Sequence, residues 1–181
     1  LPAAVHYDVC IAGGGVAGIT LALSLGRAGK KVLLLEAGGV DYSDNSQKMY
    51  SGTSIGRDYF DLDVTRLRYL GGTSNHWGGW CRPLDASDFI KKDYIDMSGW
   101  PISHEDLSPY LSGANQILET EAFPEDKILQ GSNRQLKEVF FNFSPPVRFG
   151  EKYQDQLSHS KVIDVFLNAN LVDLGLDTET G

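Results

Sequence analysis

The chain has 181 residues, 41% of them hydrophobic and 22% charged, which is typical of a folded globular protein and argues against a disordered or coiled-coil chain. Its 24 acidic residues outnumber the 16 basic ones, so the formal net charge is -8, and no block of Lys and Arg is present that would neutralise a nucleic-acid backbone. No apolar run has the length needed to cross a bilayer. We therefore expect no nucleic-acid partner and no membrane span.

The two cysteines, Cys10 and Cys81, form no CxxC pair and have no metal-ligand spacing, so we expect two free thiols and no metal site. Free thiols are the usual state in a reducing compartment. The cytoplasm is therefore slightly favoured, although the sequence assigns no location.

The start of the chain predicts a strand, a helix and a second strand. Residues 7–12 form a short apolar run that stops at a glycine turn, which indicates a buried parallel strand. Residues 16–28 carry apolar side chains at helical spacing, and the apolar run 32–35 ends at Glu36. These elements fill about thirty residues, the size of one βαβ unit. The predicted fold class is α/β, with a Rossmann-like unit and a parallel sheet.

The glycine turn matches the Gly-x-Gly-x-x-Gly pattern of dinucleotide sites, and Glu36 stands eighteen positions after Gly18. Gly13 permits the tight turn, Gly15 lets the backbone approach a diphosphate, and Gly18 lets the helix pack closely on the strand. The N–H groups of the first helical turn favour the diphosphate charge. The Glu36 carboxylate can accept hydrogen bonds from ribose hydroxyls and would repel a 2′-phosphate, which argues against NADP. The pattern alone does not separate FAD from NAD.

Beyond residue 40 the pattern is less regular. The polar stretch 41–56 predicts a surface loop. Residues 68–80 hold four glycines and two tryptophans, which would let the backbone come close to a flat or bulky group. Ser103 and Ser108 are predicted helix N-caps, and the apolar stripe of residues 110–118 predicts a helix that packs in the core.

The last part of the chain predicts a strand at residues 163–171, where apolar and polar side chains alternate. A short run at 174–176 and a turn at 177–181 would follow it. That run has no partner strand, so we expect a truncated chain whose remainder lies beyond Gly181.

Three motifs stand in a defined order: Ile11-Ala12-Gly13-Gly14-Gly15-Val16-Ala17-Gly18, Leu35-Glu36-Ala37-Gly38-Gly39 and Leu70-Gly71-Gly72-Thr73-Ser74. Together they resemble the glucose-methanol-choline (GMC) family of FAD oxidoreductases. The segment Ser98-Gly99-Trp100-Pro101-Ile102 is similar to the sugar-oxidising branch of that family. The expected cofactor is therefore FAD, and the expected binding residues are Gly13, Gly15, Val16, Ala17, Gly18, Glu36, Ala37, Gly71, Gly72, Thr73, Ser74, Asn75, His76, Trp77, Gly78 and, as an adenine contact, Leu171.

The segment Ser74-Asn75-His76-Trp77 resembles the Ser-Thr-His-Trp of the pyranose 2-oxidase branch, in which the histidine bonds covalently to the flavin. This resemblance makes His76 a candidate attachment site. The alternative is a histidine that packs or hydrogen-bonds beside a non-covalent flavin, because related sugar dehydrogenases also carry a His-Trp pair. Many GMC members place an Asn near the flavin instead, and the residue that fills that role here is open.

The resemblance also implies a domain plan and a reaction. Residues 1–181 would be the N-terminal part of a GMC-type FAD-binding domain, with the start of a substrate domain. Its expected parts are an ADP-binding βαβ unit (1–40), a flavin-proximal loop and helical excursion (41–160) and a strand that returns to the FAD domain (161–181). The implied reaction oxidises a CH–OH group of a sugar or other alcohol, with hydride passing to flavin N5.

Neither a catalytic base nor an electron acceptor is identified. The family places its histidine base near the C-terminus, whereas His6, His104 and His159 are each expected at the surface. Two alternatives stay open. An FAD-dependent hydroxylase or amine oxidase shares the first βαβ unit, and a non-catalytic dinucleotide-binding fragment would also contain it.

Overall fold

A computed structural model describes residues 5–130 and 136–175. The chain divides into two compact units, Leu1–Trp77 with Arg148–Gly181, and Gly78–Val147. The expected excursion over residues 41–160 thus begins and ends inside the first unit. The turn expected at 177–181 lies outside the described residues, as does the last residue of the run 174–176; Leu174 and Gly175 belong to no helix or strand.

The first unit is built on a parallel sheet. Its strands are β1 (Val9–Ala12), β2 (Val32–Leu35) and β7 (Ile163–Phe166), in the order β1-β2-β7. Both pairs are parallel, with Val9 opposite Val32 and Val32 opposite Ile163. The Rossmann-like α/β prediction is confirmed.

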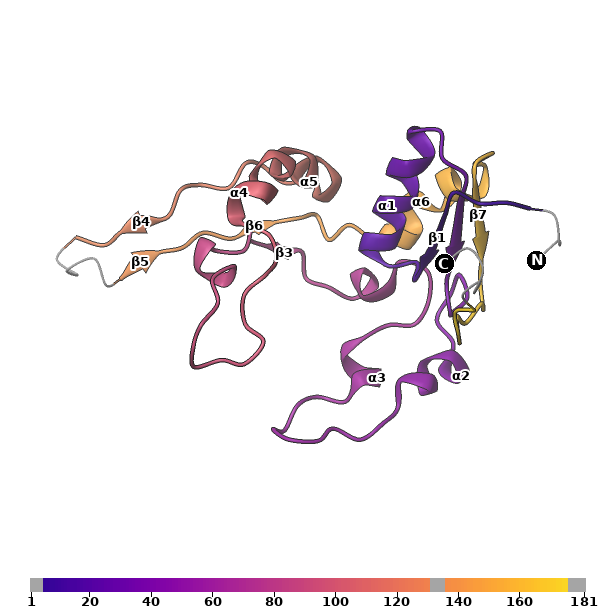
Figure 1. Cartoon of the computed structure of the whole chain (residues 1–181), viewed down its shortest axis with the longest axis horizontal. Helices are drawn as coiled ribbons and strands as arrows, with labels where there is room; N and C mark the ends of the chain where they lie inside the picture. The colour runs from indigo at the N-terminus through magenta and orange to yellow at the C-terminus, as the bar shows by residue number, and fades with distance from the viewer. Residues whose placement is uncertain (1–4, 131–135, 176–181) are drawn as a thin grey trace. The chain divides into compact units, whose positions relative to one another are not determined.

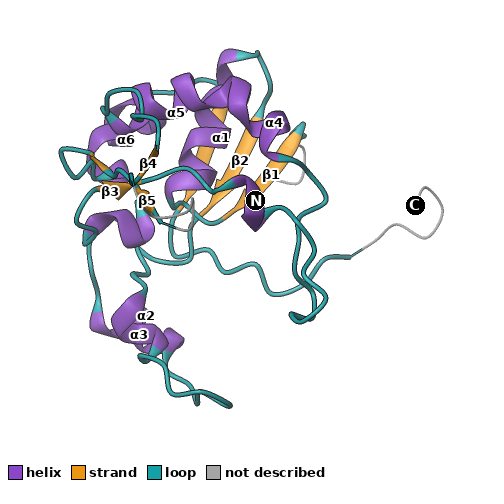
Figure 2. Cartoon of the chain, turned by 90° about the vertical axis from the view of Figure 1, so that its left-hand side faces the viewer, coloured by secondary structure: helices purple, strands orange, loops and turns teal. Residues whose placement is uncertain are grey.

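Two helices, α1 (Val16–Arg27) and α6 (Phe149–Ser158), lie on one face of this sheet (Figure 1). Figure 2 views the unit from that side, with α1 in front of the strands. Ile19 of α1 and Val32 and Leu34 of β2 are all 0% exposed, so the core lies between helix and sheet. Burial of each such side chain stabilises the fold by about 1.5–3 kcal/mol.

The strand predicted at residues 163–171 is shorter than expected. It ends at Phe166, and Asn168 has a φ of 52°, in the left-handed region where Asn is tolerated. Beyond the strand, the N–H groups of Asn168 and Ala169 donate to the carbonyls of Gly38 and Glu36. The alternating pattern therefore continues into a turn that folds the chain back toward the end of β2.

The polar stretch 41–56 is more structured than a plain surface loop. It contains α2 (Asp44–Gln47) and η1 (Lys48–Tyr50), and farther along the chain lie α3 (Leu62–Thr65) and η2 (Gly72–Asn75). Gln47 is 5% exposed, and its Nε2 donates to the carbonyls of Asp63 and Arg66. A single buried amide thus ties the loop to the segment that precedes the second glycine motif.

The described part of the second unit, residues 78–130 and 136–147, has two small antiparallel ribbons and a set of short helices. β3 (Trp80–Cys81) pairs with β6 (Asn142–Phe143), and β4 (Lys127–Ile128) pairs with β5 (Lys137–Glu138). The helices are η3 (Ala86–Asp88), α4 (His104–Leu107), η4 (Ser108–Tyr110) and α5 (Leu111–Leu118).

Of the two predicted N-caps, one is confirmed and one is wrong. The Ser103 hydroxyl accepts from the Asp106 N–H, and the Asp106 carboxylate accepts from the Ser103 N–H, which is a capping box. Ser108 instead lies within η4, and its hydroxyl donates to the Glu105 carbonyl, because helical turns run on through this point. The predicted helix at 110–118 forms, but no residue of α5 is buried, so its expected place in a core is also wrong.

The remaining sequence expectations concern thiols and membranes. Both cysteines are free, Cys10 exposed and Cys81 buried, as predicted. None of the helices within residues 5–130 and 136–175 has the length and apolar character that a bilayer span requires.

Candidate cofactor site

A cavity of about 330 Å³ opens at the edge of the sheet where the parallel strands end. It is lined by Ala12, Gly13, Leu35, Glu36, Ala37, Tyr50, Arg68, Ala169, Asn170 and Leu171. Open α/β sheets bind their ligands beyond the carboxyl ends of the strands, and ligand pockets usually have volumes of about 300–1,000 Å³. The cavity therefore has the place and size of a ligand site, and four predicted residues line it: Gly13, Glu36, Ala37 and Leu171.

The first glycine turn is tight on one side and open on the other. Gly13 has a φ of 104°, which favours glycine. A Cβ atom at Gly13 or at Gly15 would meet no atom within 4 Å, whereas one at Gly18 would lie 1.9 Å from the Gly13 carbonyl oxygen. The helix thus packs directly on the turn at Gly18, and free space remains beside Gly13 and Gly15.

Helix α1 begins at this turn. Val16 and Ala17 are exposed and form its first turn, after the N-cap Gly15. The N–H groups of a first helical turn have no partner within the helix, and they carry the positive end of its dipole. The free space beside the glycines therefore adjoins N–H donors that suit an anionic group.

Glu36 is the buried acid of the site, with 6% of its surface exposed. Its Oε2 accepts from the Gly14 N–H at 2.7 Å, and its Oε1 accepts from the Gly38 N–H at 2.7 Å. One carboxylate therefore connects the glycine turn after β1 to the turn after β2. Each carboxylate oxygen has a second lone pair, so the residue can still accept from a hydroxyl in the cavity.

The second glycine motif packs backbone to backbone against the first. The Gly71 N–H donates to the Gly14 carbonyl at 2.8 Å, and a Cβ at Gly72 would lie 3.2 Å from the Gly15 Cα. A Cβ at Gly71 would lie 2.5 Å from the nitrogen of Gly150, near the start of α6. Glycine at these positions allows three chain segments to approach one another.

The start of α6 fixes the residues that follow the second glycine motif. Nη1 of Arg148 donates to the carbonyls of Ser74 at 2.7 Å and Trp77 at 3.1 Å. The buried Ser74 hydroxyl donates to the Gly71 carbonyl and accepts from the Phe149 N–H. Residues 71–77 are thus held in place by a part of the chain more than seventy positions away.

The other predicted residues of this segment are more open. Thr73, His76 and Gly78 are exposed, and Asn75 is half-buried with its Nδ2 donating to the Leu70 carbonyl at 2.9 Å. His76 lies at the C-terminal end of η2, where its N–H donates to the Thr73 carbonyl. Its imidazole is therefore accessible to a ligand.

Two polar residues of the cavity, Arg68 and Asn170, are not among the predicted binding residues. Arg68 is 8% exposed. Its Nη1 donates to Oγ of Ser46 at 2.7 Å, and its Nη2 donates to Oδ1 of Asn170. The sequence signal of Arg68 is a charged residue at the start of the glycine-rich segment 68–80, and a single sequence offers no way to tell it from a surface arginine.

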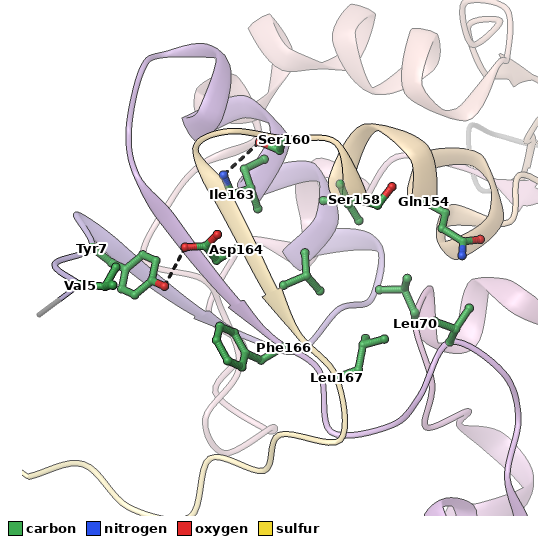
Figure 3. Close-up of a pocket in the computed structure, with 13 residues that line it drawn as sticks. Val5, Tyr7, Leu70, Gln154, Ser158, Ser160, Ile163, Asp164, Phe166 and Leu167 are labelled. Carbon is green, nitrogen blue, oxygen red and sulfur yellow. Dashed lines mark hydrogen bonds between the residues drawn. The ribbon is translucent and has the colours of Figure 1, made fainter. Parts of the chain in front are cut away.

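A larger cavity, of about 540 Å³, lies elsewhere in the first unit and contains none of the predicted residues (Figure 3). Its lining comes mainly from β7, from the end of α6 and from the segment before β1. Inside it the Tyr7 hydroxyl donates to Asp164 at 2.8 Å, a bond that raises the pKa of Tyr7. The smaller cavity, at the strand ends, remains the candidate site because the glycine turns and Glu36 meet there.

Residues 8–78 of the chain match a family model described as the FAD binding domain. The cofactor is FAD. The matched range contains the first glycine turn, Glu36 and the second glycine motif, which are the parts that the structure brings together. The chain therefore has the cofactor-binding unit of an FAD-dependent oxidoreductase.

The residues at this edge fit FAD. The space that a Cβ would fill at Gly13 and Gly15 admits a diphosphate, and Glu36 can accept from ribose hydroxyls.

The histidines outside the site are His6 and His159, which are exposed as expected, and His104, which is half-buried against the Phe89 ring.

Proposed function

We propose that this FAD-dependent oxidoreductase oxidises a CH–OH group of a sugar or another alcohol, as in the GMC family. The observation that carries the proposal is the contact between the two glycine motifs, with Gly71 bonded to Gly14 and Gly72 beside Gly15. This contact would place residues 73–78 next to the turn that receives the diphosphate. The side chains from Thr73 to Trp77 would then lie on the flavin side of it.

The cofactor would lie along the chain in a defined direction. Its adenosine would occupy the cavity of Glu36 and Leu171, its diphosphate the space beside Gly13 and Gly15, and its flavin the surface formed by residues 73–78. FAD, when bound, supplies the acceptor for a hydride from the alcohol carbon. The chain's own residues bind and orient it, and Arg148 keeps the flavin-side segment in place through the Ser74 and Trp77 carbonyls.

His76 has two possible roles within this proposal. Its exposed side chain at the end of η2 is accessible to a flavin ring, which supports either a covalent link or a contact beside a non-covalent flavin. Acid denaturation separates the two. A yellow precipitate means a covalent link, which His76→Ala should abolish, and colour that passes entirely into the supernatant rules it out.

The reaction class is tested by following the flavin spectrum of the full-length protein without oxygen. We expect aldoses or simple alcohols to bleach the visible absorption band of the flavin. Bleaching by primary amines alone would indicate the amine oxidase alternative. A requirement for NADPH and oxygen would indicate a hydroxylase. A protein that binds FAD but is bleached by none of these would contradict the proposed function and favour a non-catalytic role.

A further inference from the structure

The cavity at the strand ends, where we place the adenosine, also contains hydrogen-bond donors. They come from Arg68 and Asn170, whereas Glu36 provides an acceptor. Both residues line the cavity, and Nη2 of Arg68 donates to Oδ1 of Asn170. Arg68 is held in turn by Ser46, whose carbonyl and hydroxyl oxygens both accept from its Nη1. The Ser46 hydroxyl also donates to the Arg68 carbonyl, so the arginine is fixed at both ends.

This contact decides which way the Asn170 amide faces. A guanidinium group has five donors and no acceptor, so an amide beside it must present its oxygen. The Nδ2 group of Asn170 is then turned away from Arg68. Because Asn170 is exposed and lines the cavity, two N–H donors remain available to a ligand there.

We infer that Asn170, oriented by Arg68, recognises the adenine base of FAD by donating from Nδ2 to a ring nitrogen. A nucleoside has acceptors on the ring nitrogens of its base and donors on its ribose hydroxyls. The cavity offers the complementary pair, donors at Asn170 and an acceptor at Glu36. Asn170 would be a binding residue and Arg68 a positioning residue. The inference rests on the placement of adenosine in the proposed function.

The substitution Asn170→Asp separates the two roles of the side chain. Aspartate keeps an acceptor for Arg68 and strengthens that contact, because it becomes an ion pair. It replaces the Nδ2 donors with an oxygen that repels a ring nitrogen. Asn168→Asp is the matched control, since Asn168 lies two positions away, outside the cavity lining, and Asp also tolerates its φ of 52°.

The experiment measures the Kd of FAD for full-length apo-protein, with every variant in a His76→Ala background so that the flavin exchanges freely. We expect Asn170→Asp to raise the Kd by about 10-fold, the size of one lost hydrogen bond. The thermal midpoint of the apo-protein should stay the same or rise. Asn168→Asp should match the parent in both measurements.

Two results would overturn the inference: an unchanged Kd in Asn170→Asp, or a fall in its apo-protein midpoint that accounts for weaker binding. Neither result affects the proposed function if the parent protein binds FAD and is bleached by an alcohol. Failure of the parent to bind FAD would overturn both, so the two failures are distinguishable.

Discussion

The Glu36 carboxylate accepts a hydrogen bond of 2.7 Å from the backbone N–H of Gly14, and it accepts a second one from Gly38. Glutamine in its place would keep one acceptor and turn an N–H group toward one of these donors. We expect Glu36→Gln to lower the free energy of unfolding of the apo-protein by about 1–3 kcal/mol, the cost of one buried unsatisfied group.

Urea unfolding checks this expectation, with the exposed Glu125→Gln as the matched control. Glu36→Gln should also weaken FAD binding, because the glycine turn proposed to receive the diphosphate loses the hydrogen bond from Gly14 that anchors it. Equal stability and equal FAD affinity in the two variants would mean that the Glu36 carboxylate does not hold the two glycine turns in place.

Alanine should have opposite effects at two helical glycines. At Gly18 the added Cβ would lie 1.9 Å from the Gly13 carbonyl, whereas at Gly113 in α5 it would meet nothing within 4 Å. Gly113→Ala should stabilise the protein by up to about 1 kcal/mol, since Ala is the better helix former. Gly18→Ala should destabilise it despite the same propensity gain, because backbone atoms must move.

Thermal unfolding and FAD titration of the two glycine variants test this contrast. Gly18→Ala should also lose most of its FAD affinity. A stabilised Gly18→Ala protein would show that the turn and α1 are not packed as described.

Arg148 should control the environment of residues 73–77, which we propose to face the flavin. Arg148→Met removes the donors to the Ser74 and Trp77 carbonyls but keeps a long apolar stem. Hydrogen bonds from a charged donor contribute about 1.5–3 kcal/mol to stability. We therefore expect the free energy of unfolding, measured in urea, to fall by at least about 1.5 kcal/mol. The near-UV circular dichroism of Trp77 and the flavin spectrum should change as well.

Arg66→Met is the control for that variant, because Arg66 is exposed and, among the residues that the structure describes, its guanidinium hydrogen-bonds only to Thr65, at 3.5 Å. If both variants had the same stability and spectra, the role assigned to Arg148 would be refuted.

The ion pairs of the second unit give a dependence on pH. Arg82 and Lys137 both contact Asp85 and Asp126, and these contacts hold the pKa values of both carboxyls below their usual 3.8. A lowered folded pKa stabilises the folded state above the unfolded value, and that contribution is lost as the pH falls through the folded value. The pKa of Lys137 is raised above 10.5, so its contribution is lost only at higher pH.

We therefore expect the β4–β5 ribbon to be most protected between about pH 5 and pH 10 and to loosen in acid. Hydrogen exchange at the Leu129 N–H, which donates to the Leu136 carbonyl, reports on the ribbon. Asp126→Asn should remove most of the acid dependence, and the exposed Asp96→Asn should not. An acid dependence that survives Asp126→Asn would point to another group.

The parts of the fold that the sequence predicts are those with local signals. β1, α1 and β2 follow from apolar runs that a glycine turn separates, and the acid at Glu36 follows from its place after β2. Helix α6 is not among the predicted elements, although its buried residues Phe149, Tyr153 and Leu157 recur every four residues after a proline pair. Nothing predicts that its first turn holds residues 71–77.

The parts that the sequence could not predict depend on distant segments. The length of β7 is set by bonds from Asn168 and Ala169 to the end of β2, which an alternating pattern cannot reveal. The Arg68 and Asn170 pair joins positions 102 residues apart. Propensity and periodicity describe neighbours in the chain, so a pair of this kind requires the three-dimensional structure.

The first unit is interrupted between Trp77 and Arg148, and these two residues of that unit lie together. Nη1 of Arg148 donates to the Trp77 carbonyl at 3.1 Å, and these two residues flank residues 78–147. Within the second unit the Ser144 N–H donates to the Gly79 carbonyl at 2.8 Å. Residues 78–147 thus form a cassette with its entrance and exit together. Such a cassette can change in length or sequence during evolution without stretching the fold that holds FAD.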